Sequence, residues 1–326
     1  MDTRRILVAR TDRLGEFLLT VPAIEALART YSAASVSALV SSAVAPLAKR
    51  IPVIDAVIEA PHGPRSAWLL RAGKLAIALR RQKIDLAVVF NASKETHLAV
   101  WLAGIPIRAG YDRKWGFLLN RRIKDDRPSG SRHEIESNWL LARSAGVEEA
   151  QARVNPLRFA EEWPIVAQKL KDAGWRMGEQ LISIHPWSSN AVKAWPQERF
   201  LRLAALIAGQ ANARVVFIGG EEHAASAEQL KQPGSGFIQL VGRLSLPELG
   251  ALLKESAVVV SNDSGPMHLA AMVGTPVVAL FGTESAGSHP KRWGPWGDGH
   301  TVIRKPLSEI SPEEVFQSAQ RYVHSR

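Results

Sequence analysis

The chain has 326 residues, of which 46% are hydrophobic, and it carries a formal net charge of +10 with no cysteine. This length allows two domains with cores of their own, and the missing cysteine excludes disulfides, thiolate catalysis and zinc–sulfur sites. No apolar run approaches the ~18 residues of a membrane span, and the run after Arg5 is too short for a signal-peptide core. We therefore expect a soluble protein.

The positive charge is concentrated in the first half. Residues 1–150 hold 23 Lys and Arg against 15 Asp and Glu, whereas residues 151–326 hold 18 against 16. A basic half fits an acidic partner, such as anionic lipid headgroups or a phosphorylated or carboxylated substrate, or it is only a solvated face. No basic surface interleaved with aromatic residues is evident, which argues against a nucleic-acid partner.

Strands and helices alternate along the first half. Short β-branched runs predict strands, and apolar residues at helical spacing predict helices. The expected strands are residues 5–10, 35–40, 53–58, 85–90 and 107–110. The expected helices are residues 16–29, 71–81, 133–145 and one that starts near residue 94, with a basic loop at 113–132.

The same alternation restarts after residues 151–164, which carry two prolines and no clear period, so we place a domain boundary there. The expected strands are residues 181–185, 214–218, 237–241, 257–261 and 277–281. The expected helices are 196–207, 222–231, 267–273, 312–323 and one that starts near residue 247. Two α/β halves follow, each with a parallel sheet covered on both faces, and ligands of such sheets bind beyond the carboxyl ends of the strands.

The clearest candidate site lies in residues 256–282, which read as strand, tight turn, short helix and strand. The first N–H groups of a helix have no internal partner and bind phosphate readily. Ser264 can add a hydroxyl, Gly265 permits close approach, and His268 can donate from its ring, whereas Asp263 would repel phosphate and should cap the helix or accept from sugar hydroxyls. The alternative is that Asp263 and Ser264 only cap a helix and that His268 is a core residue.

Several common site motifs are missing. The sequence has no G-x-G-x-x-G after the first strand, no G-x-x-x-x-G-K-[ST] and no G-x-S-x-G, which argues against a dehydrogenase, a P-loop enzyme and an esterase. Asp125 and Asp126 are adjacent in a basic loop, and we predict solvated charges there rather than a metal pair. No other spacing suggests metal ligands, so we expect no metal site.

Four blocks, in order along the chain, resemble one known family. The stretch S-N-D-S-G-P-M-H-L-A-A-M-V-G-T-P-V-V-A-L-F-G resembles the signature of glycosyltransferase family 9, the lipopolysaccharide heptosyltransferase family. The opening R-R-I-L-V-A-R-T-D-R-L-G-E-F-L-L-T-V-P-A-I, the block I-S-I-H-P-W-S-S-N-A-V-K-A-W-P and the late K-R-W-G-P-W-G are similar to further family segments.

The resemblance implies the GT-B architecture, an α/β fold in which two Rossmann-like domains face each other across a cleft. We expect an acceptor-binding domain at residues 1–155, a nucleotide-sugar-binding domain at 165–306, and a C-terminal helix at 307–326 that returns to the N-terminal domain. The implied reaction is inverting, metal-independent transfer of heptose from ADP-heptose, a donor substrate, to an acidic lipopolysaccharide inner-core acceptor, without a cofactor. The implied location is the cytoplasm of a Gram-negative bacterium, with peripheral contact with the inner membrane left open.

Such a transfer needs a base for the acceptor hydroxyl. The family's presumed base is an aspartate that follows the Leu-Gly of the first loop, and the matching residue here is Glu16, one methylene longer. Asp12, four residues earlier, is the alternative base. Glu16 is alternatively an acid that only complements the helix dipole.

The departing diphosphate needs positive charge and hydrogen-bond donors. The resemblance assigns Lys193 as the phosphate cation, Ser188 and Ser189 as hydroxyl donors, Glu222 to the ribose hydroxyls and Leu244 to the adenine. Alternatively, Lys193 is a surface lysine and Glu222 is an ordinary acid in the first turn of a helix. Arg13 and Lys94 follow strand ends in the basic half, and we expect them to bind the acceptor.

Two other functions stay open. A transferase of the same fold could use another nucleotide sugar, a protein acceptor or an O-antigen intermediate. A non-catalytic nucleotide-sugar-binding relative is the second, and the change from aspartate to Glu16 is its best support.

Overall fold

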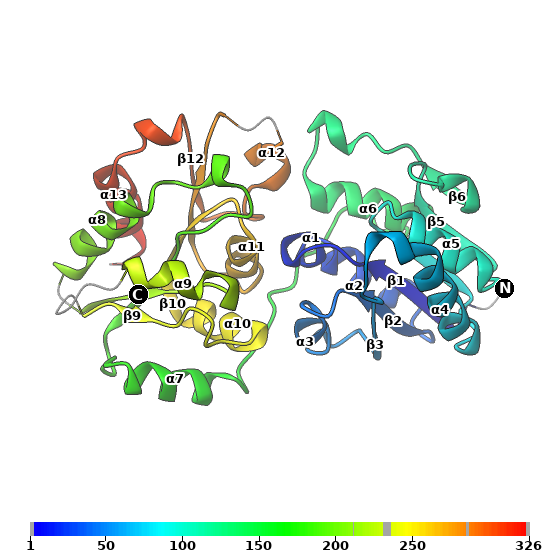
Figure 1. The fold of residues 1–326 in the computed structure, drawn as a ribbon, viewed down its shortest axis with the longest axis horizontal. Helices are drawn as coiled ribbons and strands as arrows, with labels where there is room; N and C mark the ends of the chain where they lie inside the picture. Colours follow the sequence, from blue (N-terminus) through cyan, green and yellow to red (C-terminus); the bar gives the residue numbers. More distant parts are fainter. Residues whose placement is uncertain (1–2, 211, 231–235, 285–286, 324–326) are drawn as a thin grey trace. The chain divides into compact units, whose positions relative to one another are not determined.

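The computed structural model describes residues 3–210, 212–230, 236–284 and 287–323, and the chain divides into two units, Met1–Asn155 and Pro156–Arg326 (Figure 1). No helix in the described ranges is both long and apolar enough to cross a bilayer.

The first unit is built on a six-stranded sheet in which every neighbouring pair is parallel. Its strands are β1 (Arg5–Arg10), β2 (Ser35–Val40), β3 (Ala56–Glu59), β4 (Leu86–Val89), β5 (Ile107–Tyr111) and β6 (Arg121–Ile123). Their order, β3-β2-β1-β4-β5-β6, is the Rossmann order, and the strand order reverses between β1 and β4. Ligands of such sheets bind beside this switch point.

Helices cover both faces of this sheet. They are α1 (Leu14–Leu18), α2 (Val21–Thr30), α3 (Ala45–Ala48), α4 (Trp68–Arg81), α5 (Lys94–Leu102) and α6 (Glu134–Ser144), with 3₁₀ helices η1 (Arg65–Ala67), η2 (Gly116–Leu118) and η3 (Arg127–Ser129). The helices α4 and α5 pack together on one apolar cluster with the strands, while α2 packs against α6.

The single helix expected at residues 16–29 is interrupted. Helix α1 ends at Leu18 and α2 begins at Val21, with Pro22 in its first turn. Proline has no N–H to donate, and its ring clashes with the carbonyl four residues earlier, so a continuous helix cannot pass through this position. The break leaves α1 as a short separate element at the switch point.

The second unit repeats the plan of the first. Its strands are β7 (Gln180–His185), β8 (Ala213–Phe217), β9 (Ile238–Gln239), β10 (Ser256–Asn262), β11 (Val277–Phe281) and β12 (Thr301–Arg304). All neighbouring pairs are parallel, and the order β12-β11-β10-β7-β8-β9 is again the Rossmann order. The switch point lies between β7 and β10.

The helices of the second unit are α7 (Trp163–Asp172), α8 (Gln197–Ala208), α9 (Ala224–Ala227), α10 (Leu246–Glu255), α11 (Gly265–Met272), α12 (Pro290–Trp293) and α13 (Pro312–Val323). Its 3₁₀ helices are η4 (Ala191–Lys193), η5 (Glu221–His223), η6 (Glu228–Leu230) and η7 (Leu307–Glu309). The helix expected at residues 222–231 is a series of short turns up to Leu230, and residue 231 lies outside the described ranges.

Helix α13 packs within its own unit. The family resemblance predicts that this helix returns to the N-terminal domain, and inside the second unit it packs on α8 and β10. Val315 and Ala319 are buried in the apolar cluster of that unit, together with Phe200 of α8. Since this buried stripe belongs to the second unit's core, α13 completes that unit.

Candidate functional site

A buried amide fastens two loops at the switch point of the second unit. Asn262 ends β10 and is fully buried. Its Oδ1 accepts from the Trp195 backbone N–H at 3.0 Å, and its Nδ2 donates to the Pro186 carbonyl at 3.1 Å. The loop that follows β7 is thereby held against the turn that follows β10, which carries the predicted donor residues.

Lys193 and Asp263 form an ion pair between these two loops. Lys193 Nζ lies 2.9 Å from Asp263 Oδ2, and the Ser288 hydroxyl donates to the same oxygen at 2.5 Å. The Ser188 hydroxyl donates to the Asp263 backbone carbonyl at 3.4 Å, while Ser189 is exposed on the same loop. An ammonium has three donors, so Lys193 can serve Asp263 and a ligand oxygen together.

The amino end of α11 has no side-chain cap. Ser264 is the N-cap residue, but its hydroxyl makes no capping hydrogen bond and lies 2.8 Å from the Ser261 hydroxyl instead. The capping role that the sequence offered as an alternative for Ser264 is therefore limited to its position, because its hydroxyl makes no capping hydrogen bond. The helix begins at Gly265, Pro266 occupies its second position, and His268 is buried in the first turn. The first backbone N–H groups of α11 and the positive end of its dipole therefore receive no side-chain cap from Ser264.

Glu222 and Leu244 lie on the loops that follow β8 and β9. The Glu222 side chain is 72% exposed, with its carboxylate 3.6 Å from His223 Nε2. Leu244 is half-buried just before α10. The Gly242 N–H donates to the Gly219 carbonyl at 2.9 Å, so these two loops lie side by side at the same sheet edge.

Sequence reasoning missed an aromatic cluster at this edge. The Trp187 and His223 rings are stacked at 4.8 Å with 4° between their planes, and His185 meets Trp187 edge-on at 5.9 Å. Burial, aided by the nearby His223, lowers the pKa of His185 to about 3, so this imidazole is neutral at pH 7. The H-P-W run after β7 and the histidine after G-G-E-E were the available signals.

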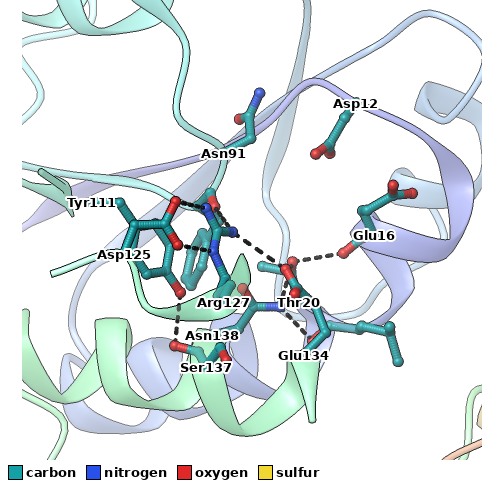
Figure 2. Close-up of polar contacts among 12 residues, drawn as sticks. Asp12, Glu16, Thr20, Asn91, Tyr111, Asp125, Arg127, Glu134, Ser137 and Asn138 are labelled. Atoms are coloured by element: carbon teal, nitrogen blue, oxygen red, sulfur yellow. Dashed lines mark hydrogen bonds and ion pairs between the residues drawn. The ribbon is translucent and has the colours of Figure 1, made fainter. Parts of the chain in front are cut away.

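In the first unit, two carboxylates stand at the carboxyl edge near the β1–β4 switch point (Figure 2). Asp12 Oδ1 lies 2.8 Å from Arg10 Nε, and Glu16 Oε1 lies 2.7 Å from Arg13 Nη2. Burial raises the pKa of Asp12, which Arg10 opposes and the charge of Glu16 reinforces. The two candidate bases are therefore electrostatically coupled, and each has its own arginine.

Arg10 belongs to a network of buried charged side chains. Arg10 is 3% exposed, and its Nη2 lies 3.2 Å from Oε1 of the fully buried Glu134. Arg127 Nη1 reaches the same Glu134 oxygen at 3.3 Å and its Nε binds Asp125 Oδ1 at 2.8 Å (Figure 2). Burying charges is tolerated only when each has a partner, and this network satisfies that condition.

The network corrects the prediction for the adjacent aspartates. Asp125 is 1% exposed and pairs with Arg127 and Arg113, so it is not a solvated charge. Asp126 is 38% exposed and pairs with Arg132. Among the described residues, no group of three or more His, Asp or Glu side chains is arranged to hold a metal ion.

The two predicted acceptor residues have different surroundings. Arg13 is largely exposed and bound to Glu16. Lys94, the first residue of α5, lines an open pocket of about 600 Å³ together with Trp68, Asn91, Ser93, Glu95 and Lys114. The structure thus brings Lys94 to a concave surface with a second lysine, an indole and a carboxylate.

Asn91 is a further residue that the sequence did not single out. It follows β4 and is labelled in Figure 2. Its Nδ2 donates to the Thr11 hydroxyl at 2.9 Å, which joins the ends of β4 and β1 across the switch point. Its only sequence signal was its place directly after a buried strand.

Comparison with known proteins assigns the chain to a family. The model of glycosyltransferase family 9 (heptosyltransferase) matches residues 72–323. Lipopolysaccharide heptosyltransferase 2 of Escherichia coli (strain K12) is 24% identical over 345 residues, covering 96% of this chain and 97% of that protein. Lipopolysaccharide heptosyltransferase 3 of Escherichia coli is 25% identical and covers 87% of this chain and 84% of that protein.

Solved structures agree on the fold. The glycosyl transferase family 9 structure from Veillonella parvula DSM 2008 has a TM-score of 0.87 at 22% identity, with complete coverage of both chains. The Escherichia coli ADP-heptose LPS heptosyltransferase II structure has a TM-score of 0.84 at 22% identity and covers 98% of each chain. The two parallel sheets thus form the GT-B architecture, and the chain belongs to glycosyltransferase family 9, the heptosyltransferase family.

Proposed function

We propose that the protein transfers a heptose from ADP-heptose to an acidic, membrane-anchored lipopolysaccharide inner-core acceptor in the cytoplasm, with inversion and without a metal ion. The observation that carries the proposal is the uncapped start of α11 beside the Lys193–Asp263 pair. A helix amino end and an ammonium together provide the positive charge that a diphosphate requires. The names of the heptosyltransferase relatives supply the sugar and the acceptor class.

In the proposed donor site, the diphosphate lies at the start of α11 and within reach of Lys193. Ser188 and Ser189 add hydroxyl donors, and Glu222 accepts from the ribose hydroxyls, because a carboxylate offers two acceptor oxygens. Leu244 packs on the adenine. His268 contacts the donor from the first turn of α11.

The proposed reaction is one displacement. The acceptor hydroxyl oxygen attacks the anomeric carbon on the face opposite the diphosphate, and the new C–O bond forms as the bond to the β-phosphate oxygen breaks. A carboxylate takes the hydroxyl proton, and ADP leaves with the bonding electrons while Lys193 and the α11 amides stabilise its charge. We assign the base to Glu16, with Asp12 as its coupled neighbour.

A comparison of nucleotides tests this function. Thermal unfolding of the full chain should shift upward with ADP more than with UDP or GDP, because the proposal assigns the base site beside Leu244 to adenine. Incubation with ADP-heptose and a heptose-deficient lipopolysaccharide core should then release ADP. Equal shifts of the unfolding temperature with the three nucleotides would contradict the adenine assignment. A shift with ADP but no release of ADP on any core acceptor would contradict the proposed acceptor class.

A further inference from the structure

Helix α4 carries an outward stripe that the core does not use. Its buried face is formed by Ala72, Leu75, Ala76 and Leu79, at the spacing expected for one side of a helix. Leu70, Lys74, Ile77 and Arg81 follow the same kind of spacing on the opposite side, and all four are exposed. We call these four residues the α4 stripe.

The apolar members of the α4 stripe are unusually open to solvent. The Leu70 side chain is 71% exposed and Ile77 is 59% exposed, while the neighbouring Leu69 is 56% exposed. The helix α5, which packs beside α4 (Figure 1), carries two more exposed large apolar side chains at its carboxyl end, Trp101 and Leu102. Exposed apolar side chains that recur along one helix face, as Leu70 and Ile77 do, are a feature of interaction sites.

The segment that carries the α4 stripe is positively charged, and one of its arginines, Arg71, is paired with Glu95 of α5. Residues 60–84 contain six Lys and Arg and no Asp or Glu. Lys74 stands between Leu70 and Ile77, and Arg81 ends the stripe. Two copies of this chain that met through the stripe in an isologous contact would bring these like charges together. The positive charges of Lys74 and Arg81 are complementary to an anionic surface rather than to a second copy of the stripe.

We infer that the α4 stripe is a docking surface for an anionic lipid membrane. A helix that lies in the membrane interface inserts its apolar side chains among the acyl chains, while lysine and arginine contact the lipid phosphates. The alternation of Leu70, Lys74, Ile77 and Arg81 supplies both groups on one exposed line. This inference concerns the first unit alone and does not depend on the proposed donor or reaction.

The test is cosedimentation of the full-length protein with vesicles. The parent protein should bind vesicles of phosphatidylcholine mixed with phosphatidylglycerol and should not bind vesicles of phosphatidylcholine alone. The pair Leu70→Ser/Ile77→Ser and the pair Lys74→Gln/Arg81→Gln should each weaken binding to the mixed vesicles by about tenfold or more. Unchanged thermal unfolding and ADP binding in the same samples would show that these variants are folded.

Matched controls test whether any exposed apolar side chain or any exposed charge, rather than the α4 stripe, accounts for vesicle binding. Ile165→Ser removes an equally exposed apolar side chain on α7, and Arg143→Gln removes an exposed charge on α6. Both should bind the mixed vesicles as the parent does. The inference is overturned if the parent does not bind the mixed vesicles, if controls and stripe variants lose binding equally, or if the stripe variants bind unchanged. A concentration-dependent dimer that the stripe variants abolish would also overturn it, in favour of a second copy.

Discussion

Lys193 and Asp263, which lie 70 residues apart, are joined by a 2.9 Å ion pair beside the start of α11. In the proposed donor complex, the Lys193 ammonium also contacts the diphosphate. Lys193→Gln should therefore weaken ADP binding by about 10- to 100-fold, the range expected for one charge-assisted hydrogen bond. Isothermal titration with ADP measures this loss. The control Lys171→Gln, an exposed lysine on α7, should bind as the parent does, and parent-like affinity in Lys193→Gln would remove the lysine from the site.

Glu16→Gln should lower the turnover rate by about 100-fold or more, because the amide cannot take a proton from the acceptor. Glu16→Asp should retain turnover, since it restores the carboxylate of the family pattern. Initial rates of ADP release measure both variants, and Asp12→Asn serves as the comparison. If Asp12→Asn abolishes turnover while Glu16→Gln keeps it, the base is Asp12.

Glu134→Gln should destabilise the first unit by about 1.5–3 kcal/mol, because Arg10 and Arg127 each lose a contact with a fully buried carboxylate and keep Asp12 and Asp125 as carboxylate partners. The midpoint of urea unfolding measures the change. Glu149→Gln breaks a more exposed pair with Arg29 and should cost less than about 1 kcal/mol. Equal losses in the two variants would contradict a role for burial.

His185→Phe should weaken the dependence of stability on pH in acid. The pKa of His185 falls from 6.5 to about 3 on folding, so the unfolded chain binds the extra proton. Stability is therefore lost as pH falls below 6.5, and at about pH 5 this one residue costs about 2 kcal/mol.

Urea unfolding of His185→Phe at pH 7 and pH 5 should show a smaller difference than in the parent. His62→Gln, which changes an exposed histidine, should keep the parent's difference. An unchanged difference in His185→Phe would show that the imidazole does not stay neutral in the folded protein.

The buried strands and the turn between β10 and α11 were predictable because their signals are local. The β-branched run before Asn262 and the Pro266 and Gly274 that flank α11 determine that element from neighbouring residues alone. The switch from strand to helix therefore placed Ser264, Gly265 and His268 correctly at one edge of the sheet.

Other features depend on distant partners and left little trace in the sequence. The strand β6 is three residues long with two exposed arginines, so it has no apolar pattern, and only its pairing with β5 defines it. Asp125 reads as a solvated charge until Arg127 and Glu134 are brought beside it in space. The docking of α13 was also decided by packing, since its apolar stripe alone does not specify which unit it covers.

Because the Asn262 side chain hydrogen-bonds to the Pro186 and Trp195 backbones, the protein's own contacts hold together the two loops of the proposed donor site. Binding then costs little conformational entropy, and most of the contact energy remains available for affinity. We therefore expect the proposed donor to bind a preformed site. The entropy of association should then contain little contribution from the ordering of loops.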